Sequence, residues 1–340
     1  DLPRRSRCPR GENCSDVASS TGRTSSIYVQ AGCHIQNNCD YTPLDAPLGF
    51  VVIDKPSGLT SHACVSRMRR VLQTKRVGHG GTLDPAVTGV LPIAVGQATR
   101  LLPYLPGEKT YRGVIQLGTS TSTDDLQGEV VALQDWPRLS LEEMDQALNP
   151  FRGGIEQCPP QVSAVHVNGE RAYARARRGE VMDLPVRSVT IHSLSLEHWD
   201  SEQGKLTLEV HCSAGTYIRS LARDLGQALG CGGCLDRLRR TQALGFVEAH
   251  AIALPEHPNE QTTPMIGSLT LIPPQRALTH LPIRTLSELE RDDWSCGRTI
   301  SHQNGDGPTV VLSADNIMLG IGIANSEDQL RPKVVFEARG

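Results

Sequence analysis

One glycine-rich segment restricts the backbone of this chain more strongly than any other. Residues 78–89 read GHGGTLDPAVTG, with Asp84 as the single carboxylate and Pro85 directly after it. Glycine reaches conformations that other residues adopt only at a cost, and proline fixes its own φ and disfavours helix at the preceding residue. We therefore expect a rigid loop that presents one carboxylate. Such a group suits nucleophilic or acid–base catalysis, whereas an aspartate that caps its own turn is the alternative that this segment leaves open.

The length and composition allow a two-domain protein with a mostly aliphatic core. The chain has 340 residues, and aromatic residues make up only 4% of them. No apolar run reaches the ~18 residues of a membrane-spanning helix, and no apolar signal core lies near the start. We expect a protein that neither crosses a membrane nor is secreted.

The first 48 residues differ in composition from the rest. They are rich in Ser, Thr and Arg and lack an apolar period, which predicts a disordered extension over residues 1–48. Five arginines against five acidic residues match a transit peptide poorly. We therefore expect a cytoplasmic protein, with an organellar stroma or matrix as the alternative if this extension is a transit peptide.

The cysteine pattern predicts no metal site. Cys231-Gly-Gly-Cys234 is one C-x-x-C motif without a second pair at zinc spacing. The cysteines of the extension, Cys8, Cys14, Cys33 and Cys39, do not have a standard zinc spacing either. Ordinary thiols are the favoured interpretation of both groups.

Residues 49–250 alternate between strand and helix patterns. Four segments have the pattern of strands: residues 49–53, 90–95, 110–117 and 206–212. Helices are expected after an N-cap at Ser61, after the capping box Ser140-x-x-Glu143, and from Ile218 to a C-capping Gly230. The elements follow no strict βαβ order, which predicts the α+β class.

The remainder of the chain has the pattern of a linker and a small domain. Residues 251–274 are expected to be a linker, because Leu254–Pro274 contains five prolines. Short apolar runs at 309–312, 317–323 and 334–336 then predict a small β-rich domain over residues 275–340.

Charge alone does not reveal the partner. The net charge is −3, and residues 49–250 carry 22 Lys and Arg against 21 Asp and Glu, a balance of +1. Three basic clusters lie in this region. They are solvated helix faces or, together, a phosphate-binding surface. The clusters are Arg67, Arg69, Arg70, Lys75 and Arg76; Arg171, Arg175, Arg177 and Arg178; and Arg237, Arg239 and Arg240.

A series of motifs in order resembles the TruB family of tRNA pseudouridine synthases. The resemblance covers about Gly49 to Phe246, with a weaker tail to Phe336 that resembles a PUA-like domain. The motifs are GFVVIDKPSGLTS (49–61), the 78–89 loop, KTYR (109–112), TSTDDLQG (121–128), QCPPQVSA (157–164), YARARRG (173–179), CSAGTYIR (212–219) and LRR (238–240).

The resemblance implies an isomerase that converts the T-loop uridine at position 55 of tRNA to pseudouridine. It implies a catalytic domain at 49–250 with a mixed, largely antiparallel sheet, an RNA-contacting insertion near 152–185 and a PUA-like domain at 275–340. The implied reaction cleaves the glycosidic bond, rotates the base and rejoins it through carbon. It needs no metal, nucleotide or redox cofactor. The implied partner is the tRNA T-arm, bound by a monomer.

The resemblance also implies roles for individual residues. Asp84 is the catalytic carboxylate, Arg219 its partner, and Tyr111 the platform on which the flipped base stacks. Further substrate-binding positions are Tyr217, His79 and Leu238, and the arginines expected to contact the RNA backbone are Arg175, Arg177 and Arg178. Taken without the resemblance, Tyr111 and Leu238 suit a core, and His79 suits a structural role. Lys55 is either a scaffold for the catalytic loop, which we favour, or a direct contact.

Two residues depart from the family pattern, and two other functions stay open. Val162 stands where an aromatic residue is usual and His166 where a lysine is usual. We expect both to lie away from Asp84 and to affect RNA affinity more than chemistry. The alternative functions are a tRNA-folding chaperone with weak or no catalysis and a guide-dependent pseudouridine synthase subunit. The presence of Asp84, Tyr111 and Arg219 favours catalysis.

Overall fold

The computed structural model describes residues 47–163, 165–167, 169–256, 269–303 and 305–336, all within one compact unit, Asp45–Gly340. The expected N-terminal extension lies outside these residues except for positions 47 and 48. Its four cysteines therefore lie outside the described residues as well. Among the described residues, no helix has the length and apolar character needed to cross a membrane.

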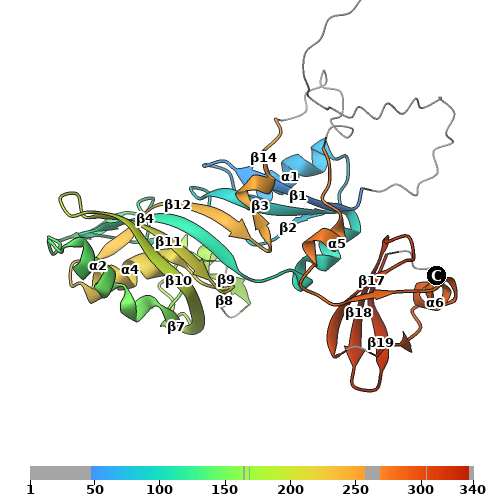
Figure 1. Ribbon diagram of the computed structural model, residues 1–340. Helices are drawn as coiled ribbons and strands as arrows, with labels where there is room; N and C mark the ends of the chain where they lie inside the picture. Colours follow the sequence, from blue (N-terminus) through green and yellow to red (C-terminus); the bar gives the residue numbers. More distant parts are fainter. Residues whose placement is uncertain (1–46, 164, 168, 257–268, 304, 337–340) are drawn as a thin grey trace, which may run out of the picture. The chain divides into compact units, whose positions relative to one another are not determined.

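A ten-stranded mixed sheet forms the region predicted to be the catalytic domain (Figure 1). Its main path runs β14-β1-β3-β12-β4-β11-β10-β7, with β2 beside β3 and β13 beside β12. Only the pairs β1–β14 and β3–β12 are parallel. The sheet therefore confirms the predicted α+β class and the largely antiparallel pairing. The strands are β1 (Gly49–Lys55), β2 (Val77–His79), β3 (Thr88–Val95), β4 (Lys109–Leu117), β7 (Gly153–Gln157), β10 (Arg187–Asp200), β11 (Lys205–Cys212), β12 (Gly233–Ala243), β13 (Phe246–Val247) and β14 (Ala251–Ala253).

The parallel pairing of β3 with β12 joins two halves of this sheet through two register pairs, Arg239 with Thr88 and Arg240 with Gly89. Glycine is required at position 89, where φ is +102° and a Cβ would lie 2.2 Å from the Arg240 carbonyl oxygen. One half contains β14, β1, β2 and β3, and the other contains β12, β13, β4, β11, β10 and β7.

Helices and two short hairpins complete the catalytic domain. The helix α4 buries Ile218, Leu221, Ala222 and Leu225 at the apolar spacing seen in the sequence, and Gly230 follows its end with φ +73°. The helical segments are α1 (Ser61–Val71), η1 (Gly96–Tyr104), α2 (Leu141–Ala147), η2 (Asn149–Phe151), α3 (Ala172–Ala176), α4 (Ile218–Ala228) and η3 (Glu248–His250), and the hairpin strands are β5 (Thr119–Thr121), β6 (Val130–Leu133), β8 (His166–Val167) and β9 (Glu170–Arg171).

The start of α1 differs from the prediction. Thr60, and not Ser61, is the N-cap, because the Thr60 hydroxyl accepts a hydrogen bond from the Ala63 N–H at 3.0 Å. Ser61 is the first residue of the helix and is buried, with its hydroxyl directed to the backbone of Leu83. Both residue types can cap, so a tertiary contact decides between them.

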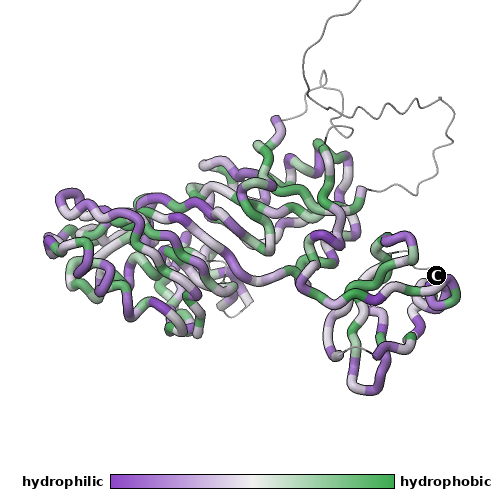
Figure 2. The backbone as a smooth tube through the Cα atoms, in the orientation of Figure 1, coloured by the Kyte–Doolittle hydropathy of each residue, from purple (hydrophilic) through white to green (hydrophobic). Residues whose placement is uncertain are grey.

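The C-terminal domain is a five-stranded sheet, as the apolar runs predicted. Its order is β15-β17-β18-β19-β16, with α6 packed on it. Figure 2 shows apolar colouring along β17 and β18 and a hydrophilic turn between β18 and β19. The elements are α5 (Pro274–Ala277), β15 (Ile283–Thr285), α6 (Glu288–Ser295), β16 (Ile300–Ser301), β17 (Gly307–Leu312), β18 (Met318–Asn325) and β19 (Gln329–Val335). The PUA-like character of this domain stays a prediction.

The two domains share one apolar core. Val310 and Phe336 of the C-terminal domain cluster with Phe50 and Leu101 of the catalytic domain. The side chain of Gln97 donates a hydrogen bond to the Phe336 carbonyl at 2.8 Å. The segment expected as a linker, 251–274, contains β14, which pairs with β1, and an isolated bridge from Ile272 to Phe50. Both ends of that segment therefore pair with β1, and residues 257–268 lie outside the description.

Candidate active site

The loop that carries Asp84 connects β2 to β3 and is held by residues that lie far from it in sequence. Lys55, at the end of β1, is completely buried. Its ammonium group donates hydrogen bonds to the carbonyl oxygens of Pro56 at 2.8 Å, Leu59 at 2.7 Å and Pro85 at 3.0 Å. Burial lowers the pKa of Lys55. Lys55 thus fixes the carbonyl group of Pro85, the residue after Asp84, which agrees with the scaffold interpretation.

Ser61 and Arg240 hold the loop on its other sides. The Leu83 N–H donates to the Ser61 hydroxyl at 2.8 Å. Arg240, on β12, donates from Nε to the Val90 carbonyl at 2.8 Å and from Nη2 to the Gly81 carbonyl at 3.1 Å. The guanidinium therefore contacts the backbone on both sides of Asp84. Arg240 is completely buried, and burial lowers its pKa.

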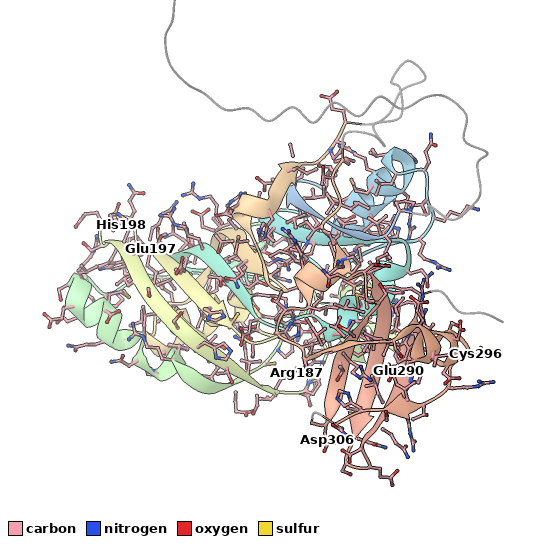
Figure 3. The ribbon with its side chains drawn as sticks, turned by 45° about the vertical axis from the view of Figure 1, so that its right-hand side comes forward. Arg187, Glu197, His198, Glu290, Cys296 and Asp306 are labelled. Carbon is pink, nitrogen blue, oxygen red and sulfur yellow. The ribbon has the colours of Figure 1, made fainter. Side chains whose placement is uncertain are left out.

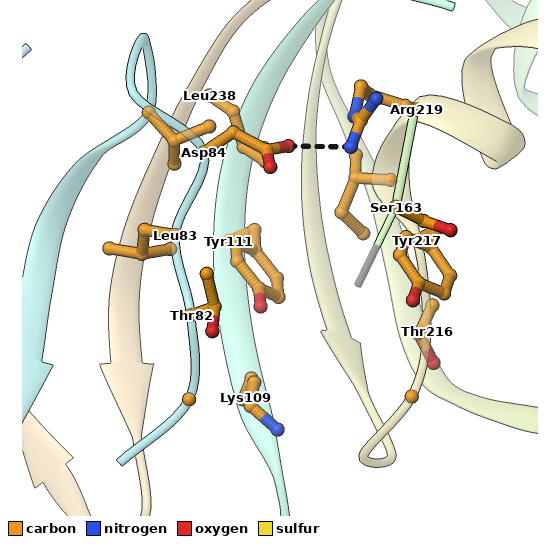
Figure 4. A pocket seen from close by; sticks show the side chains of 14 residues that line it. Thr82, Leu83, Asp84, Lys109, Tyr111, Ser163, Thr216, Tyr217, Arg219 and Leu238 are labelled. Atoms are coloured by element: carbon orange, nitrogen blue, oxygen red, sulfur yellow. Dashed lines mark ion pairs between the residues drawn. The ribbon is translucent and has the colours of Figure 1, made fainter. Parts of the chain in front are cut away.

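An ion pair joins this loop to the opposite half of the sheet. Arg219 Nη2 lies 2.9 Å from Asp84 Oδ2, with 7% of the Arg219 side chain exposed and 44% of the Asp84 side chain (Figure 4). Arg219 is the second residue of α4, which begins after Tyr217 as its N-cap residue. A buried arginine thus presents a positive charge to a carboxylate that remains accessible, as an electrostatic partner of a reactive group would.

Arg219 contacts two further segments, the 121–128 motif and the insertion. Its Nη1 donates to the Thr123 carbonyl at 3.1 Å, its Nη2 donates to the Val162 carbonyl at 2.9 Å, and its Nε lies 3.7 Å from Asp125 Oδ2. A guanidinium has five N–H donors in a fixed plane, so these contacts fix its orientation. The motif at 121–128 and the insertion are therefore tied to the Asp84–Arg219 pair.

A cavity of about 250 Å³ opens beside the ion pair. Asp84 and Tyr111 lie on one wall, and Arg219 and Tyr217 lie on the facing wall (Figure 4). Leu238 also lines it. A small pocket with aromatic, apolar and a few charged groups suits one flat polar molecule. Tyr111 is 7% exposed, and burial raises its pKa, so its hydroxyl is protonated at neutral pH.

Comparisons with known proteins show the family of the chain. The model of the TruB family pseudouridylate synthase N-terminal domain matches residues 69–218, and that of the tRNA pseudouridylate synthase B C-terminal domain matches residues 219–257. The tRNA pseudouridine synthase B of Synechococcus sp. (strain CC9311) is 92% identical over 297 residues, which cover 87% of this chain and 100% of that protein.

The chain belongs to the TruB family.

A second relative supports the assignment, and two solved structures share the fold. The tRNA pseudouridine synthase B of Synechococcus sp. (strain WH7803) is 68% identical over 87% of this chain and 100% of that protein. The fold resembles a Cbf5 chain in a Cbf5-Nop10-Gar1 complex, with a TM-score of 0.63, 24% identity and 86% coverage of each chain. It also resembles a chain of an H/ACA RNP bound to a substrate RNA containing 2′-deoxyuridine, with a TM-score of 0.63, 22% identity and 85% coverage of each chain.

Five of the residues that the TruB resemblance singled out line the same cavity: Asp84, Tyr111, Tyr217, Arg219 and Leu238. His79 does not line it. His79 is half-buried in β2, its Nδ1 has no hydrogen-bond partner among the described residues, and burial lowers its pKa. Its proximity to RNA stays a prediction.

The three arginines expected to contact the RNA backbone lie outside the cavity, in or just after α3. Arg178 forms a two-bond pair with Glu170 at 2.6 and 2.8 Å, and Arg175 lies 2.6 Å from Glu180. Arg177 differs, because its exposed guanidinium lies over the Tyr173 ring at 5.5 Å and has no ion pair among the described residues. Arg177 is therefore the most available of the three.

Two sequence interpretations need correction. Val162 does not lie away from the catalytic pair, because its carbonyl oxygen bonds the same Arg219 Nη2 that contacts Asp84. Its backbone, and not its side chain, makes this contact, so the departure in residue type leaves the contact intact. The other correction concerns Arg240, which was grouped with a surface cluster but is completely buried. It cannot contribute to a phosphate-binding surface.

Sequence reasoning did not assign Lys109 or Ser163 to the site, although both line the cavity. Both residues lie in motifs that carry the resemblance, KTYR and QCPPQVSA. The motifs marked these positions but implied no role for them. Lys109 precedes Tyr111 by two positions on β4, which places the two side chains on the same face of the strand.

Proposed function

We propose that this protein isomerises uridine to pseudouridine at position 55 in the T-loop of tRNA, with Asp84 as the catalytic residue. The observation that carries the proposal is the Asp84–Arg219 pair at the wall of a pocket that also presents Tyr111. The names of the relatives, tRNA pseudouridine synthase B, point to the same substrate.

The reaction breaks the bond from C1′ to N1 and forms a bond from C1′ to C5, while N1 gains a proton and C5 loses one. A carboxylate near C1′ can add to the sugar or stabilise the positive charge that develops there. Asp84 is suited to either role, because Arg219 orients its carboxylate and Lys55 fixes the carbonyl group of the following residue, Pro85. Arg219 is itself held by two carbonyl oxygens, so it does not reorganise as charge develops.

The uridine must leave the RNA stack to reach this pocket. Tyr111 supplies an aromatic face for the flipped base, and Leu238 excludes water beside it. The insertion contacts the T-arm outside the pocket, with Arg177 as its most available cation. The protein acts on tRNA as a cytoplasmic monomer.

The test is pseudouridine mapping on an unmodified tRNA transcript incubated with the purified chain alone. The wild-type protein forms pseudouridine at position 55. Asp84→Asn forms none and binds the transcript within about tenfold of wild type, because the substitution keeps the shape and removes the charge. A wild-type protein that binds tRNA without modifying it would favour the folding chaperone, and activity only with an added guide RNA would favour the guide-dependent subunit.

A further inference from the structure

Arg240 is a buried cation that no carboxylate balances among the described residues. Its side chain is completely buried, Nε and Nη2 donate to the carbonyl oxygens of Val90 and Gly81, and Nη1 has no hydrogen-bond partner among those residues. A buried charge without a partner of opposite charge lowers stability, and a neutral glutamine could also donate to a carbonyl group. Holding the loop therefore explains two contacts of Arg240 but not its charge.

The register of the sheet places Arg240 against Tyr111. The two residues are direct partners on the neighbouring antiparallel strands β12 and β4. Side chains of direct partners lie on the same face of a sheet, with Cβ atoms about 4.5–5.5 Å apart. Tyr111 lines the active-site cavity, and Figure 4 shows its hydroxyl end directed toward Thr82 and Lys109, which line the cavity as well. Arg240 thus lies behind a hydroxyl group in the cavity wall.

The charge of Arg240 acts on the Tyr111 oxygen. Burial is the main effect on Tyr111 and raises its pKa, whereas the guanidinium of Arg240 lowers that pKa. The interaction is mutual, because burial lowers the pKa of Arg240 and Tyr111 raises it. Cys212 and Asp84 also act on Tyr111, but both raise its pKa. Of these three neighbours, only Arg240 favours negative charge on the phenol oxygen.

The proposed reaction creates a negative charge that the cavity must stabilise. When the bond from C1′ to N1 breaks, its electron pair stays with the uracil, which is an anion until C5 joins C1′. Arg219 is the nearest cation to Asp84, and that carboxylate already balances its charge. A phenol beside a cation is more acidic, and hydrogen bonds to a charged partner are roughly twice as strong as neutral ones.

We propose that Arg240 is a positioning residue, whose buried charge strengthens the hydrogen bond that the Tyr111 hydroxyl donates to the detached, anionic uracil. The inference rests on the proposed function, because it takes uridine as the occupant of the cavity. It gives the ring and the hydroxyl of Tyr111 separate tasks, stacking and stabilisation of charge. Arg240 contributes through Tyr111 and does not itself line the cavity.

The first test measures the acidity of position 111 in the free protein, without RNA. A trifluorinated tyrosine replaces Tyr111, because its more acidic phenol titrates where the protein is folded, and fluorine NMR follows it. We expect Arg240→Gln to raise the titration midpoint by about one pH unit or more, the effect of removing a nearby charge. Arg239→Gln is the matched control. Arg239 is the adjacent arginine of β12, but it faces the other side of the sheet and pairs with Asp54, so its loss leaves the midpoint unchanged.

The second test asks whether Arg240 acts through the hydroxyl during the reaction. We expect Tyr111→Phe to lower the single-turnover rate about tenfold in the wild-type background and less than about threefold in the Arg240→Gln background. If Arg240 only holds the loop, the two losses multiply. An unchanged titration midpoint in Arg240→Gln overturns the proposal, and so do losses that multiply.

A measurement on the wild-type sequence at position 240 covers the case in which Arg240→Gln does not fold. Titration of the fluorinated tyrosine must then shift the ¹⁵N resonances of the Arg240 guanidinium at the same midpoint. Guanidinium resonances that do not respond overturn the proposal. A wild-type protein that forms no pseudouridine refutes the proposed function instead. That outcome is separate, because the titrations use neither RNA nor activity.

Discussion

The Lys55→Met substitution tests whether one buried ammonium group holds the catalytic loop. Methionine has nearly the length of lysine and fills the space left by the side chain, but it donates no hydrogen bond. Three carbonyl oxygens lose the Lys55 Nζ donor, those of Pro56, Leu59 and Pro85. The Pro85 oxygen also accepts from the Gly58 N–H at 2.8 Å, so it stays satisfied.

The Leu59 carbonyl, on a half-buried residue, is then left without a donor among the described residues, whereas Pro56 is exposed and water can satisfy its carbonyl. One unsatisfied buried group costs about 1–3 kcal/mol. Removing a desolvated charge offsets part of this loss. We expect the free energy of unfolding to fall by about 1–2 kcal/mol and the melting temperature by about 2–8 °C. Because Pro85 is next to Asp84, we also expect a rate loss of about 100-fold, the effect of a displaced reactive group.

The measurements are thermal unfolding, single-turnover pseudouridine formation and tRNA binding, with Lys75→Met as control. Lys75 is exposed and forms no ion pair among the described residues, so its replacement leaves the melting temperature and the rate on bound tRNA unchanged. We expect tRNA affinity in Lys55→Met to stay within a few-fold of wild type. A Lys55→Met protein with wild-type stability and rate would refute the reasoning. A selective loss of binding would instead support a direct contact of Lys55 with RNA.

Three further outcomes follow from the structure. Tyr111→Ala loses catalysis, whereas Tyr111→Phe keeps base stacking, worth ~1–3 kcal/mol, and so tests the contribution of the hydroxyl alone. Normal turnover by the alanine variant in the tRNA assay would make Tyr111 a core residue only. Arg177→Ala lowers the slope of log affinity against log salt by about one unit. Arg178→Ala changes the slope less, because the Arg178 guanidinium is already paired with Glu170. Equal slopes for the two variants would remove Arg177 from the RNA contact. Among the described cysteines, we expect iodoacetamide at pH 8 to label the exposed Cys296 (Figure 3) before Cys212. Burial raises the pKa of Cys212 to about 11, which leaves about 0.1% of its thiol as thiolate. Peptide mapping that finds Cys212 labelled first would contradict this.

The sequence predicted which residues meet at the cavity better than it predicted what holds them there. Asp84, Tyr111 and Arg219 belong to motifs whose family roles could be carried over by position. The rigidity of the 78–89 loop was expected from its glycines and proline. In the structure it also depends on Lys55, whose scaffold role the resemblance had suggested, and on Ser61 and Arg240, for which no such role was expected. Spacing along the chain contains no information on contacts between such distant residues.

The basic cluster on β12 shows where pattern reasoning fails. Adjacent residues of a strand point to opposite faces, so Arg239 and Arg240 have different surroundings. Arg239 pairs with Asp54 at 2.9 Å on one face, while Arg240 is buried against the catalytic loop. Charge counted along the sequence treats the two residues alike. Their difference appears only when β3 is known to pair with β12.

The narrow junction between β3 and β12 gives distant substitutions a route to the chemistry. Asp84 is carried by the half of the sheet that contains β3, and Arg219 by α4, which packs on β12 in the other half. A change in the angle between the halves therefore alters the separation of the two charges directly. Gly89 lies at that junction with its Cα against the Arg240 backbone. A side chain added there must displace the Arg240 backbone, so we expect it to disturb the Asp84–Arg219 pair and slow the reaction without touching the RNA.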